Sequence, residues 1–362
     1  MWRNWFQKAP SAHTLQLQPS GERLQAQASE SILQSALAQG LAFPHNCRVG
    51  GCGECKCKLL SGQVKELTDK SYLLSAEELQ QGYILACQSR PRSDVVVEVR
   101  LGARLDRPPV IDAQAQIAGL QRLCDDIIHL RLTLDRDLAY LAGQCADIVV
   151  PAAAGVAAGQ VRSYSFASAP SPGAAREVDF FVRKVVGGAF TEWLFLQARV
   201  GDTLSVRGPQ GQFGWVSGGE PMLCLAGGSG LAPILAILQA AIAARQALRP
   251  LTLVVGARTQ ADLYAEEAID QIRRQWGGRF VYAPILSAEP PGSGWAGRQG
   301  WVAEHLPALL GDRLGDQAAW VCGPPPMVDA CAEALQSAGV PPARLHLDRF
   351  LDASHRPAGH AA

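Results

Sequence analysis

The stretch Cys47-Arg-Val-Gly-Gly-Cys52-Gly-Glu-Cys55, followed further along by Leu85-Ala86-Cys87-Gln88, carries the strongest signal in this chain. Its cysteines have the C-x4-C-x2-C…C spacing by which proteins hold a [2Fe–2S] cluster. Two irons need four thiolates, and one loop can supply three only if its backbone wraps the metal closely. The glycines of the loop permit this, because glycine adopts conformations that other residues avoid. The spacing predicts a one-electron carrier with Cys47, Cys52, Cys55 and Cys87 as iron ligands.

The composition is that of a globular protein with two or three domains. The chain has 362 residues, of which 48% are hydrophobic and 18% charged, and its formal net charge is +0. This balance gives no general field that would attract nucleic acid, and none is expected as a partner. No run of about 18 apolar residues indicates a membrane span, and residues 1–8 lack the apolar core of a signal peptide. We expect a cytoplasmic enzyme, and a monomeric one.

The cysteines outside the first motif give weaker signals. Ten cysteines fit a reducing compartment, where clustered cysteines usually bind metal or take part in catalysis. Five have no motif around them and are expected to be small buried hydrophobic side chains: Cys57, Cys124, Cys145, Cys224 and Cys331. Zinc at the four motif cysteines is an open alternative, which a protein without the visible absorption of an iron–sulfur cluster would support.

Residues 10–101 predict a small mixed α/β unit around that cysteine motif. Apolar and polar residues alternate in 14–18 and 24–28 with a Ser-Gly turn between them, which indicates a hairpin. Ser29 or Ser31 is expected to cap a short helix that follows.

Residues 108–215 begin after a charged break that ends in two prolines. Many short strands separated by glycine and proline are typical of a closed or partly closed antiparallel β-barrel. The clearest expected strands are 127–134, 148–151, 178–182 and 203–206, and a helix is expected near 191–196. The Ala/Gly run 151–159 is expected to be a loop without a function.

Residues 220–350 alternate short apolar runs with helical stretches, which predicts a parallel α/β sheet. The first run ends in Gly227-Gly228-Ser229-Gly230 and the last in Cys322-Gly323-Pro324. Ligands of such sheets bind at the carboxyl ends of the strands, and a glycine turn before a helix binds pyrophosphate. A tight turn alone would explain the glycines, but a second motif at another strand end favours a binding site.

Two further motifs lie in the middle part. In Arg162-Ser163-Tyr164-Ser165, on an expected strand, the arginine could clamp a phosphate and the tyrosine could stack on a ring. Later, a strand with Arg183 runs into Gly187-Gly188 and a helix capped by Thr191, again an anion-binding arrangement. Four residues alone do not distinguish the first motif from an ordinary exposed strand.

In this order the motifs resemble those of the ferredoxin-NADP reductase superfamily, specifically the NADH-dependent reductase components of multicomponent oxygenases. The resemblance spans about residues 12 to 350. It implies a plant-type ferredoxin domain of α+β, ferredoxin-like β-grasp fold (10–101), an antiparallel β-barrel flavin domain (108–215) and an α/β parallel-sheet NAD(P)-binding domain (220–350). An N-terminal cluster domain resembles the branch that uses FAD, whereas a C-terminal one accompanies FMN, so FAD is expected.

The resemblance implies roles for the flavin residues. Arg162 would bind the flavin phosphate, Tyr164 would pack on the isoalloxazine, and Ser165 would hydrogen-bond near N5. Gly188 and Thr191 would receive the FAD pyrophosphate, and Arg183 is expected to be a further cofactor-binding residue.

The resemblance also implies roles at the nicotinamide site. The dinucleotide would lie on Gly227, Gly228, Ser229 and Gly230, with Cys322, Gly323 and Pro324 beside the nicotinamide. Phe350 would cover the flavin and move aside for nicotinamide, although Asp348 replaces the family's usual Glu and twelve residues follow Phe350. The catalytic residues are thus expected to be Ser165, Cys322 and Phe350.

The implied activity is that of an oxidoreductase in electron transport, in which electrons pass from NADH to FAD, then to the [2Fe–2S] cluster, then to an oxygenase, a hydroxylase or another acceptor protein. Arg258 could hold the 2′-phosphate of NADPH, but Asp262 would disfavour another anion, so NADH is expected. One alternative resembles the deoxysugar-pathway reductases of CDP-6-deoxy-glucoseen type. Another is a non-catalytic redox-sensing module, which would oxidise no nicotinamide.

Overall fold

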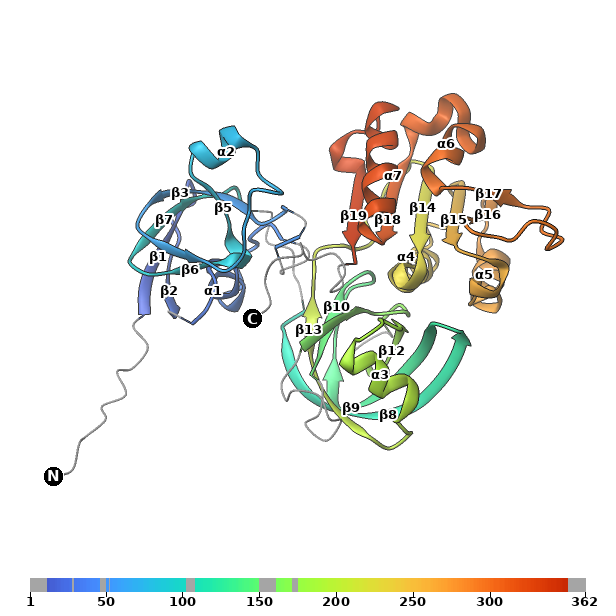
Figure 1. Cartoon of the computed structure of the whole chain (residues 1–362), viewed down its shortest axis with the longest axis horizontal. Coiled ribbons are helices and arrows are strands. Elements are labelled where there is room, and N and C mark those ends of the chain that lie inside the picture. The colour runs from blue at the N-terminus through green and yellow to red at the C-terminus, as the bar shows by residue number, and fades with distance from the viewer. Residues whose placement is uncertain are drawn as a thin grey trace. The chain divides into compact units, whose positions relative to one another are not determined.

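The chain forms two compact units, residues 1–107 and 108–362, each with its own core (Figure 1). The computed structural model describes residues 12–27, 29–45, 50–51, 53–101, 108–149, 161–170 and 175–350. Within these ranges, no helix combines the length and the apolar character that crossing a bilayer would require.

The first unit is built on a five-stranded sheet of order β2-β1-β7-β3-β5. Only the pair β1–β7 is parallel. The strands are β1 (Ala12–Gln18), β2 (Arg23–Gln27), β3 (Lys56–Ser61), β5 (Tyr83–Leu85) and β7 (Val95–Glu98), and β4 (Val64–Glu66) pairs separately with β6 (Ser89–Pro91). The predicted hairpin is confirmed, and Ser31 caps α1 (Ile32–Ala38) through a capping box with Gln34.

The second unit starts with a six-stranded antiparallel sheet of order β11-β10-β13-β8-β9-β12. Its strands are β8 (Ile111–Cys124), β9 (Ile127–Leu138), β10 (Cys145–Val149), β11 (Val161–Ser165), β12 (Ala175–Arg183) and β13 (Thr203–Gln210). A single bridge, Phe166 to Phe180, joins the chain after β11 to the other edge strand. Inward side chains of this sheet pack with those of α3 (Ala189–Leu196). The expected loop 151–159 lies outside the described residues.

A second sheet, entirely parallel as predicted, completes this unit in the order β17-β16-β15-β14-β18-β19. Its strands are β14 (Met222–Gly227), β15 (Leu251–Ala257), β16 (Phe280–Leu286), β17 (Arg298–Gln299), β18 (Ala318–Gly323) and β19 (Leu345–Arg349). The helices are α4 (Leu231–Ala243), α5 (Glu266–Gln275), α6 (Val302–Leu310) and α7 (Pro325–Ser337). Alternate residues of β14 pack toward α4 and α5 on one face and toward α6 and α7 on the other.

The prediction that all unassigned cysteines are buried is wrong for two of them. Cys57, Cys224 and Cys331 are buried, but Cys124 and Cys145 are only half-buried. The exceptions lie at strand ends, where polar partners are within reach. Cys124 ends β8 and donates to Asp126 Oδ1 (3.5 Å), and Cys145 begins β10 and donates to the carbonyl of Gln210 (3.5 Å).

The turn after β3 should be sensitive to a single added carbon atom. Gly62 has a φ of +92°, and a Cβ there would overlap the carbonyl oxygen of Asp94 and lie 2.8 Å from Val95 Cγ1. We expect Gly62→Ala to destabilise the first unit by about 2–4 kcal/mol, as strain plus overlap. Calorimetric unfolding of the full chain should show a lower transition for this unit and an unchanged one for residues 108–362.

Gly21 provides the matched control, because it has a φ of +76° but nothing within 4 Å of an added Cβ. Gly21→Ala should cost only the backbone term, about 1 kcal/mol. Equal losses in the two variants would mean that the contact with Asp94 is unimportant.

Candidate functional site

Two of the four predicted iron ligands lie in the described part of the first unit. Cys55 directly precedes β3, and Cys87 lies in the 3-10 turn η1 (Ala86–Gln88) after β5. Both are buried and their Sγ atoms are 3.2 Å apart. The pairing of β3 with β5 and the hydrogen bond from Ala86 N to Cys55 O (3.0 Å) set this approach. Two sulfur atoms held this close fit joint ligation of one iron. Cys47 and Cys52 lie outside the described residues.

Residues beyond the cysteine motif support the loop. Gly50 has a φ of +82°, and a Cβ there would lie 2.6 Å from Gln88 Cγ. The hydroxyl of Tyr72 donates to the Gly50 carbonyl, and Gln88 Nε2 donates to Cys87 Sγ at 3.8 Å. Hydrogen bonds to ligand sulfurs are among the features that set a cluster's reduction potential. The spacing of the cysteines does not predict a role for either Tyr72 or Gln88.

The motif from Arg162 to Ser165 lies on the edge strand β11. Arg162 is exposed, and the half-buried Tyr164 packs against Phe190 of α3 with ring centroids 5.6 Å apart. Because side chains alternate along a strand, Arg162 and Tyr164 share one face while Ser165, which is buried, faces the other way. Burial raises the pKa of the Tyr164 phenol, so its ring stays neutral.

Thr191 holds the glycine loop before α3 in shape. Its Oγ1 accepts from Val185 N (3.1 Å) and lies within hydrogen-bond distance of the carbonyls of Val185 (3.1 Å) and Gly188 (2.9 Å). A Cβ on Gly188 would lie 2.7 Å from that hydroxyl oxygen. The prediction that Thr191 caps this helix is wrong, because the N-cap is Gly188, no side chain caps it, and Thr191 lies within the first turn. The first amides of α3 are thus presented by a rigid turn, in which Glu192 of the helix's first turn already accepts from Gly187 N (3.1 Å).

The two glycine motifs of the parallel sheet meet at its centre. β14 has β15 on one side and β18 on the other, so the strand order reverses here, where α/β sheets bind ligands. A Cβ on Gly323 would lie 2.9 Å from the Gly227 carbonyl, and a Cβ on Gly230 would overlap the Cys322 carbonyl. The helix that follows, α4, has no side-chain cap and no acidic residue in its first turn. This arrangement fits a pyrophosphate.

Cys322 and Phe350 lie at the same strand ends. The Cys322 thiol is fully buried and 3.8 Å from Asp348 Oδ2, its register partner on β19. Burial first, and then the negative charge of Asp348, raise the pKa of this thiol well above its usual value, so it stays protonated. Phe350 N donates to the Gly323 carbonyl (2.8 Å), which anchors the half-buried aromatic residue beside the glycine turn.

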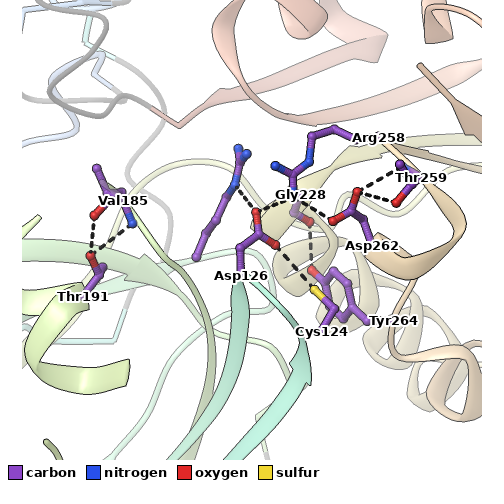
Figure 2. A network of polar contacts seen from close by, with 10 residues as sticks. Cys124, Asp126, Val185, Thr191, Gly228, Arg258, Thr259, Asp262 and Tyr264 are labelled. Carbon is purple, nitrogen blue, oxygen red and sulfur yellow. Dashed lines mark hydrogen bonds and ion pairs between the residues drawn. The ribbon is translucent and has the colours of Figure 1, made fainter. Parts of the chain in front are cut away.

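A polar network crosses from the antiparallel sheet to the parallel sheet within the second unit. Asp126, in the turn between β8 and β9, accepts from Arg183 Nε (3.2 Å) and from Arg258 NH2 (3.0 Å) through the same oxygen, Oδ2. Tyr264 donates from its hydroxyl to the Gly228 carbonyl (2.8 Å). Figure 2 shows Asp126 between the guanidinium of Arg258 and the sulfur of Cys124, with the tyrosine hydroxyl aimed at the glycine.

Arg258 follows β15 and is held on its other side by Asp262. Its NH2 donates to Asp262 Oδ1 at 2.6 Å, and the other oxygen of Asp262 accepts from Thr259 N and Oγ1, both at 3.0 Å. Partial burial acts to raise the pKa of Asp262, but the hydrogen bonds from Arg258 and Thr259 outweigh this effect and lower the pKa. The carboxylate is therefore ionised at neutral pH.

The structure brings many of the sequence-predicted residues together and adds others. Gly227, Gly230, Cys322, Gly323 and Phe350 meet at adjoining strand ends, as the carboxyl-end argument predicts. Arg183 lies over Gly228, since a Cβ on that glycine would be 3.6 Å from Arg183 Cδ. Sequence analysis missed Asp126 and Tyr264. The turn containing Asp126 is recognisable, but its arginine partners lie 57 and 132 residues away and leave no local pattern.

Three families match successive parts of the chain. Residues 15–92 match the family described as "2Fe-2S iron-sulfur cluster binding domain", 114–215 the "Oxidoreductase FAD-binding domain" and 224–333 the "Oxidoreductase NAD-binding domain".

Named proteins are similar to this chain over nearly its whole length. The chain is 40% identical to the xylene/toluene monooxygenase electron transfer component XylA of Pseudomonas putida, over 94% of each sequence. It is 33% identical to the phenol 2-monooxygenase reductase component DmpP of Pseudomonas sp. strain CF600, over 95% of this chain and 96% of that one. The crystal structure of the cytochrome P450 reductase GcoB of Amycolatopsis is similar with a TM-score of 0.80 and 32% identity, over 93% of this chain and 98% of that one. The chain therefore belongs to the family of NAD(P)H-dependent electron-transfer reductases of oxygenase systems, which combine [2Fe–2S], FAD-binding and NAD-binding domains.

Proposed function

We propose that this protein takes electrons from NADH and passes them through FAD and its [2Fe–2S] cluster to an oxygenase or hydroxylase component. One chain combines glycine turns at the centre of a parallel sheet, where its strand order reverses, with a buried pair of cysteine sulfurs in a separate unit, and this combination carries the proposal. The first accepts a two-electron donor, and the second belongs to a one-electron carrier. FAD, when bound, supplies the step between them, because it accepts a hydride and can release electrons singly.

Side chains of β11 and α3 would position the FAD. In this proposal Arg162 binds its phosphate, Tyr164 packs on its isoalloxazine ring, and Ser165 hydrogen-bonds near N5. Thr191 acts by keeping the loop at Gly188 open to the pyrophosphate, since its hydroxyl is already bonded to that loop.

At the nicotinamide end, the glycine turn from Gly227 to Gly230 would bind the pyrophosphate. Cys322 then presents a neutral thiol beside the ring, because burial and Asp348 both oppose its ionisation. The Phe350 side chain can turn aside while its backbone stays fixed by the bond to the Gly323 carbonyl. Both residues shape the space and exclude water, and neither needs to exchange a proton.

Finer features of the sequence-based interpretation remain predictions. They include a β-grasp fold for the first domain, a monomeric state, a cytoplasmic location and the domain boundaries 10–101, 108–215 and 220–350. Closure of the antiparallel sheet into a barrel is supported by the bridge between Phe166 and Phe180. The similarity to oxygenase reductases favours the proposed role over a deoxysugar reductase or a sensing module.

Anaerobic titration of the purified protein with NADH tests the electron path. The visible spectrum should show the flavin bleaching first and the cluster afterwards, because hydride transfer can reach only the flavin. A flavin that is fully reduced while the cluster stays oxidised would contradict the internal transfer. NADPH, added at the same concentration, should act more slowly.

Removing one iron ligand should separate the two halves of the path. Cys52→Ser leaves the cluster with three thiolates, so electron transfer to a protein acceptor should fall about a hundredfold or more. NADH-driven reduction of a small dye at the flavin should be unchanged. Cys57→Ala, which alters a buried cysteine outside the motif, should keep both activities. Normal acceptor reduction by Cys52→Ser would exclude this cysteine as a ligand.

The loop at Gly188 gives a test of flavin binding. Thr191→Val keeps the side-chain shape but leaves the Val185 amide without its partner, a loss of about 1–3 kcal/mol. We expect the Kd for FAD, measured by refilling the apoprotein, to rise roughly tenfold or more. Thr191→Ser retains the hydroxyl and should bind FAD nearly as well as wild type. Equal Kd values for the valine and serine variants would show that the hydroxyl plays no part.

A further inference from the structure

Arg258 lies where a dinucleotide's adenosine would be expected, and its charge is balanced by two ion pairs with carboxylates. It follows β15, the neighbour of β14, which carries the glycine turn. In dinucleotide-binding sheets the residues after the second strand contact the adenosine ribose, where an arginine accommodates a 2′-phosphate and a carboxylate binds the 2′-hydroxyl. Arg258 alone would therefore favour NADPH.

Two carboxylates oppose that preference. One nitrogen of Arg258, NH2, donates to Asp262 Oδ1 (2.6 Å) and to Asp126 Oδ2 (3.0 Å). Asp262 is fixed from within its own turn by Thr259, so it is part of the local structure after β15. Asp126 comes from the turn between β8 and β9, 132 residues earlier, and so belongs to the antiparallel sheet.

The local charge balance shows what Asp126 contributes. Among the four ion-paired side chains, Arg183 and Arg258 provide two positive charges and Asp126 and Asp262 two negative ones, so these four charges cancel. Without the Asp126 charge the cluster would be positive, with Arg258 about half exposed, at 54% of its side chain. The 2′-phosphate adds about −1.5 to −2 charge at pH 7, which the two carboxylates held at Arg258 NH2 would repel.

We propose that Asp126 is a specificity-determining residue. It lies in the flavin-binding part of the chain and holds Arg258 against Asp262, and so it makes the nucleotide site disfavour NADPH. The inference rests on the proposed NADH-dependent function and names the group that enforces it. Asp126 acts by position and charge, and takes no part in hydride transfer.

Binding of the oxidised nucleotides tests this without any turnover. The Kd values of NAD⁺ and NADP⁺ would be measured by titration calorimetry on the full-length, FAD-loaded protein at low salt. We expect Asp126→Asn to lower the ratio of Kd for NADP⁺ to Kd for NAD⁺ about fivefold, the effect of one exposed charge pair. The change should shrink as salt is added. Bound FAD and thermal unfolding would be checked on the same sample.

Asp125→Asn is the matched control, because Asp125 is exposed on the same turn and, among the described residues, has no ion pair with either arginine. It removes an identical charge and should leave the ratio unchanged. A second control tests the route: in an Arg258→Gln background, adding Asp126→Asn should no longer change the ratio.

The outcomes separate the inference from the function on which it rests. An unchanged ratio in Asp126→Asn, with normal NAD⁺ binding, would overturn the inference and leave the proposed function intact. Equal tightening of both nucleotides would also overturn it, because the charge would then act through Arg183 on the shared pyrophosphate. A wild-type protein that binds neither nucleotide would overturn the proposed function and the inference together.

Discussion

The close backbone approach of β14 and β18 is the constraint on which the second unit depends. These strands end in Gly227 and Gly323. A Cβ on Gly323 would lie 2.9 Å from the Gly227 carbonyl, and a Cβ on Gly227 would lie 2.6 Å from Met327 Sδ. Parallel pairing in register, Ala226 beside Cys322, extends this approach to the start of α4. The result is a strand end with bare backbone at its glycines, beside the uncapped start of α4 and the anchored backbone of Phe350.

The antiparallel sheet contributes to this region as well as to flavin binding. Its longest hairpin, β8–β9, places Asp126 beside Arg258 at the carboxyl end of β15. Strand β12 places Arg183 close to Gly228. Phe181 of β12 also packs edge-on against Tyr264, with ring centroids 5.4 Å apart. Apolar and ionic contacts thus join the two sheets at the point where FAD and the nicotinamide dinucleotide are expected to meet.

Features set by local sequence were predictable, and features set by distant contacts were not. The glycine turns, the strands of the parallel sheet and the first three cysteines could be recognised because each pattern lies within about ten residues, and Cys87 was added by the resemblance to a known spacing. β8 was missed, since its buried face is partly alanine, at Ala113 and Ala115, which is a weak strand former. The pairing of Asp126 with Arg183 and Arg258 depends on how the sheets pack, and the residues around each partner carry no trace of it.

The turn between β8 and β9 also bears on how such chains can diverge. Asp126 in this turn forms an ion pair with Arg258 of the nucleotide-binding domain. That domain alone would therefore lack one of the two carboxylates that balance the charge of Arg258. Joining the same parallel sheet to a flavin domain with another residue in this turn would alter the charge around Arg258 without changing any residue of the sheet. Recombination can exchange whole domains at their boundaries, but a binding site can include residues from two domains. Exchanging one domain can therefore change the specificity of a site that lies mainly in the other.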